Sequence, residues 1–149
     1  LNAIVDFSLQ SKTSAVITQP LAVATTDTDT AIDIPANSLI ESIGILYVEN
    51  VTLAATSTFD VAFGTSAAGV DLVASTNVGP NNVTILANSF ASTSNGNISV
   101  AGGTALVMAV AAPLFTGTTS TSIFVSTVVG TAALASASSF RVVVNYRGL

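Results

Sequence analysis

The sequence predicts an all-β protein, an antiparallel β-sandwich with jelly-roll-like closure. Val, Ile, Thr and Phe dominate its apolar runs. Turn residues interrupt these runs at intervals of about ten residues, which is typical of sandwiches and barrels. No long stretch has the period of a helix. The segments 58–63 and 140–147 instead place aromatic or β-branched side chains at every second position, as a strand with one buried face requires.

About eight or nine strands of this kind suit such a sandwich. We expect residues 1–20 to form an N-terminal arm or strand and residues 21–149 to form a single β-sandwich domain. The expected strands, in chain order, are Asn2–Leu9 (or an arm), Leu39–Leu53 with a possible bulge at Gly44, Thr58–Phe63, Val70–Ser75, Val83–Leu86, Ile98–Ala101, Thr104–Ala112, Thr121–Val129 and Phe140–Arg147. Before them, Ser11–Pro20 is expected to be extended, and Ala31–Ile34 leads into the turn at Pro35. The expected connections are the polar segment Thr25–Thr30 and turns at Pro35–Asn37, Gly64–Gly69, Gly79–Asn82, Asn95-Gly96 and Pro113–Thr119.

Charged residues are scarce, and this excludes several classes of function. The chain has only three cations, Lys12, Arg141 and Arg147, against eight carboxylates. Nucleic-acid binding and polybasic membrane attachment both need a cluster of cations, so neither is expected. The longest apolar run, 105–115, contains Pro113 and is only about half the length of a membrane-spanning helix. The chain begins at Leu1 rather than Met, so residues that precede it stay an open alternative.

The residues that usually carry catalysis are almost absent. The chain has no His and no Cys, so neither a Ser-His-Asp arrangement nor a thiol nucleophile can form. Glu41 and Glu49 are too far apart on one strand to act together as a carboxylate pair. We therefore expect a protein that is not an enzyme, with no catalytic, cofactor-binding or metal-binding residues and no cofactor.

Two motifs invite a sharper interpretation than their context supports. Asp27, Asp29 and Asp33 resemble a calcium loop, but the glycine and terminal glutamate of an EF-hand are missing, so a solvated acidic loop is expected. Glycosylation sequons begin at Asn50, Asn82 and Asn97. With 10 Asn and 38 Ser or Thr in 149 residues, chance alone gives about 10 × 38/149, or roughly 2.6 sequons, so glycosylation is not favoured.

Other residues have two interpretations each. Arg141 and Arg147 share one strand face, where they either protect an edge strand or contact an acidic patch on a partner. The seven phenylalanines are most simply core or interface residues, and with no Trp a carbohydrate platform is not expected. Tyr47 and Tyr146 are possible contact residues without forming a site.

Four stretches of the chain resemble small virion proteins of tailed double-stranded DNA phages, namely their capsid decoration (cement) and head-fibre proteins. They are DIPANSLIESIGILYVENV, TFDVAFGTSAAGVDLVAST, GNISVAGGTALVMAVAAPL and SSFRVVVNYRGL, and together they span roughly residues 31–147. The resemblance implies a β-sandwich or jelly-roll body that trimerises and binds the major capsid protein on the exterior of the capsid, across neighbouring capsomers. Residues 1–30 match nothing in that group, and we expect them to reach a neighbouring subunit or the shell.

A second class of function stays open. The same Ser- and Thr-rich composition suits a subunit of an extracellular filament or adhesin, in which the segment Asn2–Leu9 completes the sheet of the next subunit. A host-binding head fibre is a third and weaker alternative.

Overall fold

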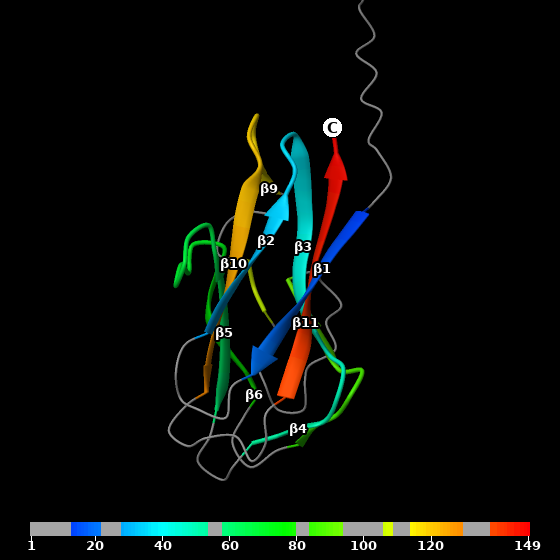
Figure 1. Ribbon diagram of the computed structural model, residues 1–149, viewed down its shortest axis with the longest axis vertical. Helices are drawn as coiled ribbons and strands as arrows, with labels where there is room; N and C mark the ends of the chain where they lie inside the picture. The colour runs from blue at the N-terminus through cyan, green and yellow to red at the C-terminus, as the bar shows by residue number, and fades with distance from the viewer. Residues whose placement is uncertain are drawn as a thin grey trace, which may run out of the picture.

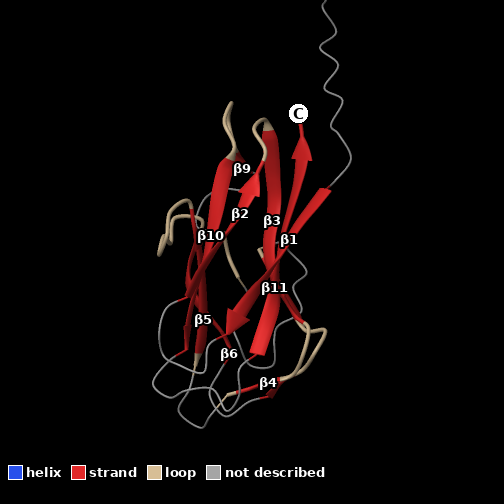
Figure 2. Ribbon diagram, viewed as in Figure 1, coloured by secondary structure: helices blue, strands red, loops and turns tan. Residues whose placement is uncertain are grey.

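The computed structural model describes residues 13–21, 28–53, 58–79, 84–93, 106–108, 114–129 and 138–149. These residues form eleven strands and no helix (Figures 1 and 2). The strands are β1 (Thr13–Leu21), β2 (Thr28–Ile34), β3 (Ser38–Tyr47), β4 (Val51–Thr52), β5 (Phe59–Gly64), β6 (Val73–Gly79), β7 (Thr84–Ile85), β8 (Phe90–Ser92), β9 (Leu114–Phe115), β10 (Thr121–Val129) and β11 (Ser138–Gly148). A search of the described residues for a helix long and apolar enough to cross a membrane finds none.

The strands build two antiparallel sheets. Sheet A has the order β1-β11-β3-β8, with β9 also paired to β3, and sheet B has the order β2-β10-β5-β6. Strands β1 and β11, β2 and β10, β3 and β8, and β5 and β6 pair in turn. The chain thus behaves as one long hairpin whose tip is the β5–β6 connection, rolled so that successive pairs alternate between the sheets. This is the jelly-roll arrangement, and the predicted fold class is confirmed.

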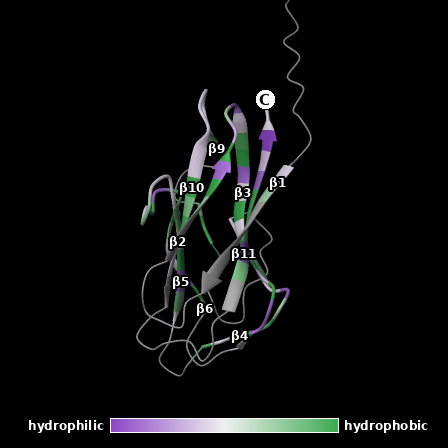
Figure 3. Ribbon diagram, viewed as in Figure 1, coloured by the Kyte–Doolittle hydropathy of each residue, from purple (hydrophilic) through white to green (hydrophobic). Residues whose placement is uncertain are grey.

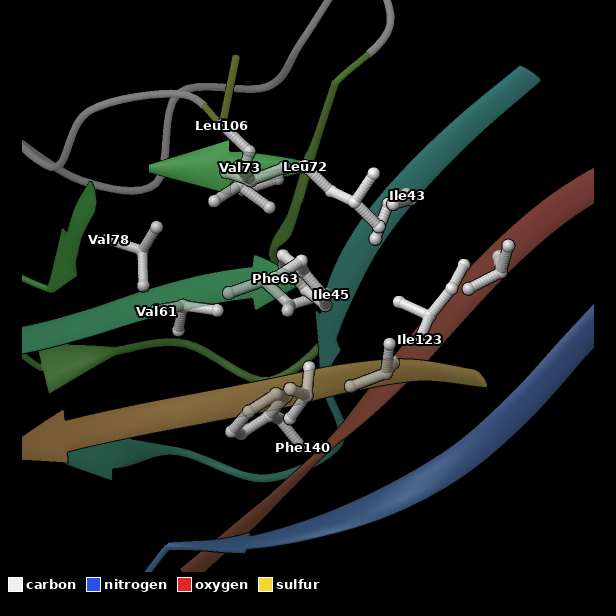
Figure 4. Packing of buried hydrophobic residues seen from close by; sticks show 14 of the residues in the cluster. Ile43, Ile45, Val61, Phe63, Leu72, Val73, Val78, Leu106, Ile123 and Phe140 are labelled. Carbon is white, nitrogen blue, oxygen red and sulfur yellow. The ribbon is translucent and has the colours of Figure 1, made fainter. Parts of the chain in front are cut away.

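The core fills the space between the sheets. Tyr47 and Phe140 of sheet A meet Phe59 of sheet B, and all three side chains are fully buried. The Tyr47 ring centroid lies 6.3 Å from that of Phe59 and 6.3 Å from that of Phe140, and the two phenylalanine centroids are 5.5 Å apart. The Tyr47 hydroxyl donates a long hydrogen bond of 3.4 Å to the Val78 carbonyl, and burial raises the pKa of this phenol. In Figure 4, Leu106 lies beside Val73 at one side of the same cluster.

The predicted alternation is confirmed on two strands. Phe59, Val61 and Phe63 of β5 are fully buried, as are Phe140, Val142 and Val144 of β11. The predicted turn at 35–37 is also confirmed, and Asn37 adopts φ 52°, a left-handed conformation that Asn tolerates better than most residues.

The predicted strand Leu39–Leu53 is wrong in extent. The chain leaves the sheet after Tyr47 and resumes as the short β4, which pairs with β7 outside the two main sheets. The bulge lies at Glu41 rather than Gly44, because Asn145 of β11 faces Ser42 while Tyr146 faces Ile40. Gly44 instead allows a close approach: an added Cβ would lie 2.7 Å from Cζ of Phe90.

Other boundaries also differ from the predictions. The polar segment Thr25–Thr30 is not wholly a connection, because β2 begins at Thr28. Strand β6 starts at Val73, so the predicted strand Val70–Ser75 begins too early. Residues 106–108, inside the predicted strand Thr104–Ala112, are not in a strand, although Leu106 is buried. Strands β8 and β9 were not predicted. The predicted strands Asn2–Leu9 and Ile98–Ala101 and the Asn95-Gly96 turn lie outside the described residues.

The described part of the N-terminal segment is a strand of the sandwich. Residues 13–21 form β1, which pairs with β11 over nine residues without interruption and so belongs to sheet A. The predicted boundary at residue 20 therefore falls at the end of a strand, while the arm proper would lie in residues 1–12, outside the described part of the chain.

We expect Phe59→Ala to lower the free energy of unfolding by about 3–5 kcal/mol, because it empties a fully enclosed site between the sheets. Denaturant titration measures the change. The matched control is Phe115→Ala at a side chain 49% exposed, which should cost much less. Equal losses for the two variants would contradict the core described above.

Candidate interaction surfaces

The outer face of sheet A carries both arginines of the chain. We call the outward side chains of β11 and β3 the arginine face: Glu41, Ser42, Leu46, Arg141, Val143, Asn145 and Arg147. Strand β11 lies between β1 and β3, so the interpretation of these arginines as protecting an edge strand is wrong. They stand near the middle of a sheet surface instead.

Polar contacts order the arginine face. The Arg147 Nε donates to Oε1 of Glu41 at 2.6 Å, and this pair is about one-third exposed. The Ser14 hydroxyl donates to Oδ1 of Asn145 at 2.6 Å, and Nδ2 of Asn145 donates to the Ser42 hydroxyl at 2.9 Å. Three strands are thus tied across their outer face. Arg141 is exposed and has no ion pair with any residue in the described part of the chain.

The outer face of sheet B carries carboxylates. We call its outward side chains the carboxylate face: Ala31, Asp33, Asp60, Ser122 and Phe124, with the buried Ala62 and Ser126 between the two carboxylates. Asp33 is exposed, and its Oδ1 accepts a hydrogen bond of 2.6 Å from the Ser122 hydroxyl. Asp60 is half-buried, and its Oδ1 is enclosed without a hydrogen-bond partner among the described residues. Desolvation raises the pKa of the Asp60 carboxyl.

A third feature is the end of the sandwich where the chain closes. The Leu149 N–H donates to the Asn37 carbonyl at 2.8 Å, and the Asn37 N–H donates to the Gly117 carbonyl at 2.7 Å. The Thr116 hydroxyl donates to the Pro35 carbonyl at 3.0 Å. These bonds join three segments that are distant in sequence around a shallow, open hollow of about 340 Å³. In Figure 3 the hydrophilic colour gathers toward this end of β2, β3 and β11.

One carboxylate holds the loop after β5 in place through hydrogen bonds. Asp71 accepts hydrogen bonds from the Thr65 N–H at 2.9 Å and from the Thr65 hydroxyl at 2.8 Å. These bonds lower the pKa of Asp71. Ala68 adopts φ 56° in the same loop, and Val70 is 53% exposed there. The loop therefore holds a fixed shape with an apolar side chain on its surface.

The other residues named in the sequence analysis, namely the aspartates, the sequon asparagines and the tyrosines, do not come together in one site among the described residues. Among the described residues no cluster of three metal-ligating side chains occurs. Asp33 stands on a strand rather than in a loop. Asp27 lies outside the described residues. Asn50 is not in a strand as predicted, and its Oδ1 accepts a hydrogen bond from the Ala87 N–H. Asn82 and Asn97 fall outside the described residues. Tyr47 belongs to the core, and Tyr146 packs partly against it.

Sequence reasoning missed one contact here. The Glu41–Arg147 pair joins residues 106 apart, and no local pattern signals it. The outward position of Asp60 was predicted, because Asp60 alternates with the buried Phe59 and Val61.

The fold and these surfaces define a jelly-roll β-sandwich with two polar outer faces. No known family model matches the chain, and no curated protein matches it. Among solved structures, a chain of the cyanophage Pam1 capsid asymmetric unit is similar over 100% of this chain and 93% of its own length, with a TM-score of 0.51 and 15% identity. At this identity the likeness is one of fold.

A weaker likeness is to a chain of the infectious bursal disease virus VP2 subviral particle. It covers 99% of this chain but 37% of the viral chain, with a TM-score of 0.39 and 12% identity. At that score it adds nothing to the assignment.

We expect the two carboxylates Asp60 and Asp71 to affect stability in opposite directions. Asp60 has a raised folded-state pKa, so the stability linked to its neutral form is lost as pH rises through that pKa. Asp60→Asn should therefore stabilise the protein at pH 7. Asp71 has a lowered pKa, so its contribution is present above the ordinary Asp value and lost as pH falls through the folded-state pKa. Asp71→Asn should therefore destabilise it at pH 7.

Thermal unfolding at pH 7 and at about pH 3 measures both effects, and both differences from the wild-type protein should shrink at the lower pH. Shifts of the same sign in the two variants at pH 7 would contradict this assignment.

Proposed function

We propose that this chain is a structural protein of a virion. In this role it decorates and stabilises a capsid, binding the outer shell across neighbouring capsomers as a homotrimer. The observation that carries the proposal is the likeness of fold to a chain of a phage capsid asymmetric unit, which extends over nearly the full length of both chains. The motifs within residues 31–147 that resemble phage decoration proteins support the finer role.

The outer faces of the sandwich suit contacts with other proteins better than catalysis. Among the described residues, the outer faces carry hydroxyl, amide and small apolar side chains with few charges. Interfaces that are buried on assembly are depleted in charge in the same way. A protein that binds the assembled shell better than free capsid subunits stabilises the shell by mass action. The partner would be the major capsid protein and the location the capsid exterior.

The alternative of a filament built by strand donation has less support. Donation of the kind expected here fills an empty strand position in the sheet of the next subunit. Here the described residues supply four paired strands to each sheet, and every strand pair of the jelly roll is present. The described sandwich therefore offers no empty strand position in its core.

We expect the full chain to co-sediment with empty shells of the virus that encodes it, and to raise the temperature at which those shells disrupt. Light scattering across a concentration series at high salt should show a fixed small oligomer in the absence of shells. A chain that leaves the shells untouched would overturn the decoration role. Open-ended growth by a strand exchange that needs residues 1–12 would favour the filament instead.

Deleting residues 1–12 tests the proposed arm. The deletion ends before β1, so it leaves the paired strands of sheet A intact. We expect the shortened chain to keep its thermal transition but to lose most of its shell binding or its oligomer size. Unchanged shell binding and oligomer size would contradict a role for the arm.

A further inference from the structure

The two outer faces of the sandwich carry charges of opposite sign. The arginine face holds both arginines of the chain, with Glu41 paired to one of them. The carboxylate face, on the other side of the sandwich, holds Asp33 and Asp60 and contains no cation. Lys12, the third cation of the sequence, lies outside the described residues. The described sandwich therefore has an excess of positive charge on one outer face and of negative charge on the other.

The spacing of the charges matches as well. Arg141 and Arg147 are six residues apart on β11. Asp60 stands opposite Val128 of β10 and Asp33 opposite Ser122, so their rows are also six residues apart. At about 3.4 Å per residue, each pair spans roughly 20 Å along the strand direction. Asp33 and Asp60 lie on β2 and β5, on either side of β10, so they are also offset by two strands, or about 10 Å, across the sheet.

The order of the charges along the sandwich matches too. Arg147 and Asp33 both lie toward the end where the chain closes, marked C in Figure 1, and Arg141 and Asp60 lie toward the opposite end. A second copy stacked on the first in the same orientation therefore brings each arginine near one carboxylate. The outer faces of twisted sheets can meet in this way with their strands roughly aligned.

Two of these four groups lack a partner within the described part of the chain. Oδ1 of Asp60 is enclosed and accepts no hydrogen bond. Arg141 is exposed and makes no ion pair there. This Asp60 oxygen is enclosed by the chain itself, so a second copy can approach the half-buried Asp60 only where its carboxylate is still exposed. A guanidinium presents donors in the planar arrangement that a carboxylate accepts.

We propose that the arginine face of one copy docks on the carboxylate face of a second copy, with Arg141 of the first against Asp60 of the second. Leu46 and Val143 on one face and Phe124 on the other provide apolar area between the charged rows. The contact joins two different surfaces on opposite sides of the sandwich, so it links copies in an open row rather than closing a ring. It adds to the trimer proposed above and does not rest on shell binding.

Sedimentation of the full chain without shells tests the contact. At low salt, the average mass should rise with concentration above that of the smallest species, and added salt should reduce the rise. Arg141→Glu and Asp60→Arg should each weaken this association by about tenfold or more, because each places like charges in contact. The double variant keeps the net charge of −5 and should recover most of the association.

Mixing the two single variants gives a sharper result. The intact arginine face of the Asp60→Arg chain can meet the intact carboxylate face of the Arg141→Glu chain. The two substituted faces also carry opposite charges, as they do in the double variant, so only contacts between chains of the same kind repel. The mixture should therefore recover the association, in rows in which the two kinds of chain alternate, although each variant alone associates only weakly. Glu49→Lys is the control, because it changes the net charge as much as Asp60→Arg but lies in the connection after β3, outside both faces.

Circular dichroism checks that each variant folds. If Asp60→Arg does not fold, Asp33→Arg at an exposed position replaces it and should weaken the association in the same direction. The inference is overturned if the wild-type chain keeps one mass at every concentration. It is also overturned if a folded charge reversal leaves the association unchanged, or if the double variant fails to recover it. Loss of shell binding alone would overturn only the decoration role.

Discussion

The contact between the inner faces of the two sheets is the interaction on which the rest of the structure depends. Tyr47 and Phe140 of sheet A and Phe59 of sheet B meet at its centre, and aliphatic side chains from both sheets surround them. The chain has no cysteine, so no disulfide can hold the sheets together. Burial of apolar surface must therefore supply most of the stability, at about 25 cal/mol for each Å² removed from water. Because side chains alternate along a strand, those of the two sheets that do not enter this contact face outward, and they make up the outer faces.

Register is the second constraint, and it explains the bulge at Glu41. A slip of one residue would turn every inward side chain of a strand outward. On β11 the inward positions alternate without a break from Phe140 to Val144 and continue to the partly packed Tyr146. On β3 the fully buried Ile40 and Ile43 are three apart, so one extra residue is needed to keep both in the core. That residue is Glu41, and it reaches Arg147 on the outer face. The ion pair thus forms where the core requires an irregularity.

The sequence was sufficient for the fold class and for those strands whose pattern is local. The alternation of Phe59, Val61 and Phe63 is enough to predict which face of their strand is buried. Strand β10 matches its predicted range. The order of strands in the sheets depends on pairs such as Thr13 with Tyr146, which no local pattern encodes. Strands β8 and β9 have only three and two residues and exist because β3 pairs with them, so their own sequence gives little signal. The charge distribution was predictable only in part: the shared face of Arg141 and Arg147 follows from their spacing, whereas the opposite placement of Asp33 and Asp60 needs the topology.

The scarcity of long charged side chains has its own consequence for assembly. Ordering a Lys, Arg or Glu at an interface costs up to about 1.5–2 kcal/mol of rotamer entropy, whereas Ser, Thr and Ala lose much less. A surface made mostly of short side chains therefore associates with a small ordering cost, and modest contact areas can suffice. On such a surface the few charges that remain decide orientation more than strength, since complementary charges suppress wrong pairings. In the contact proposed above, two arginines on one face and two carboxylates on the other, each pair offset by six residues along the strands, would favour one relative orientation of two copies.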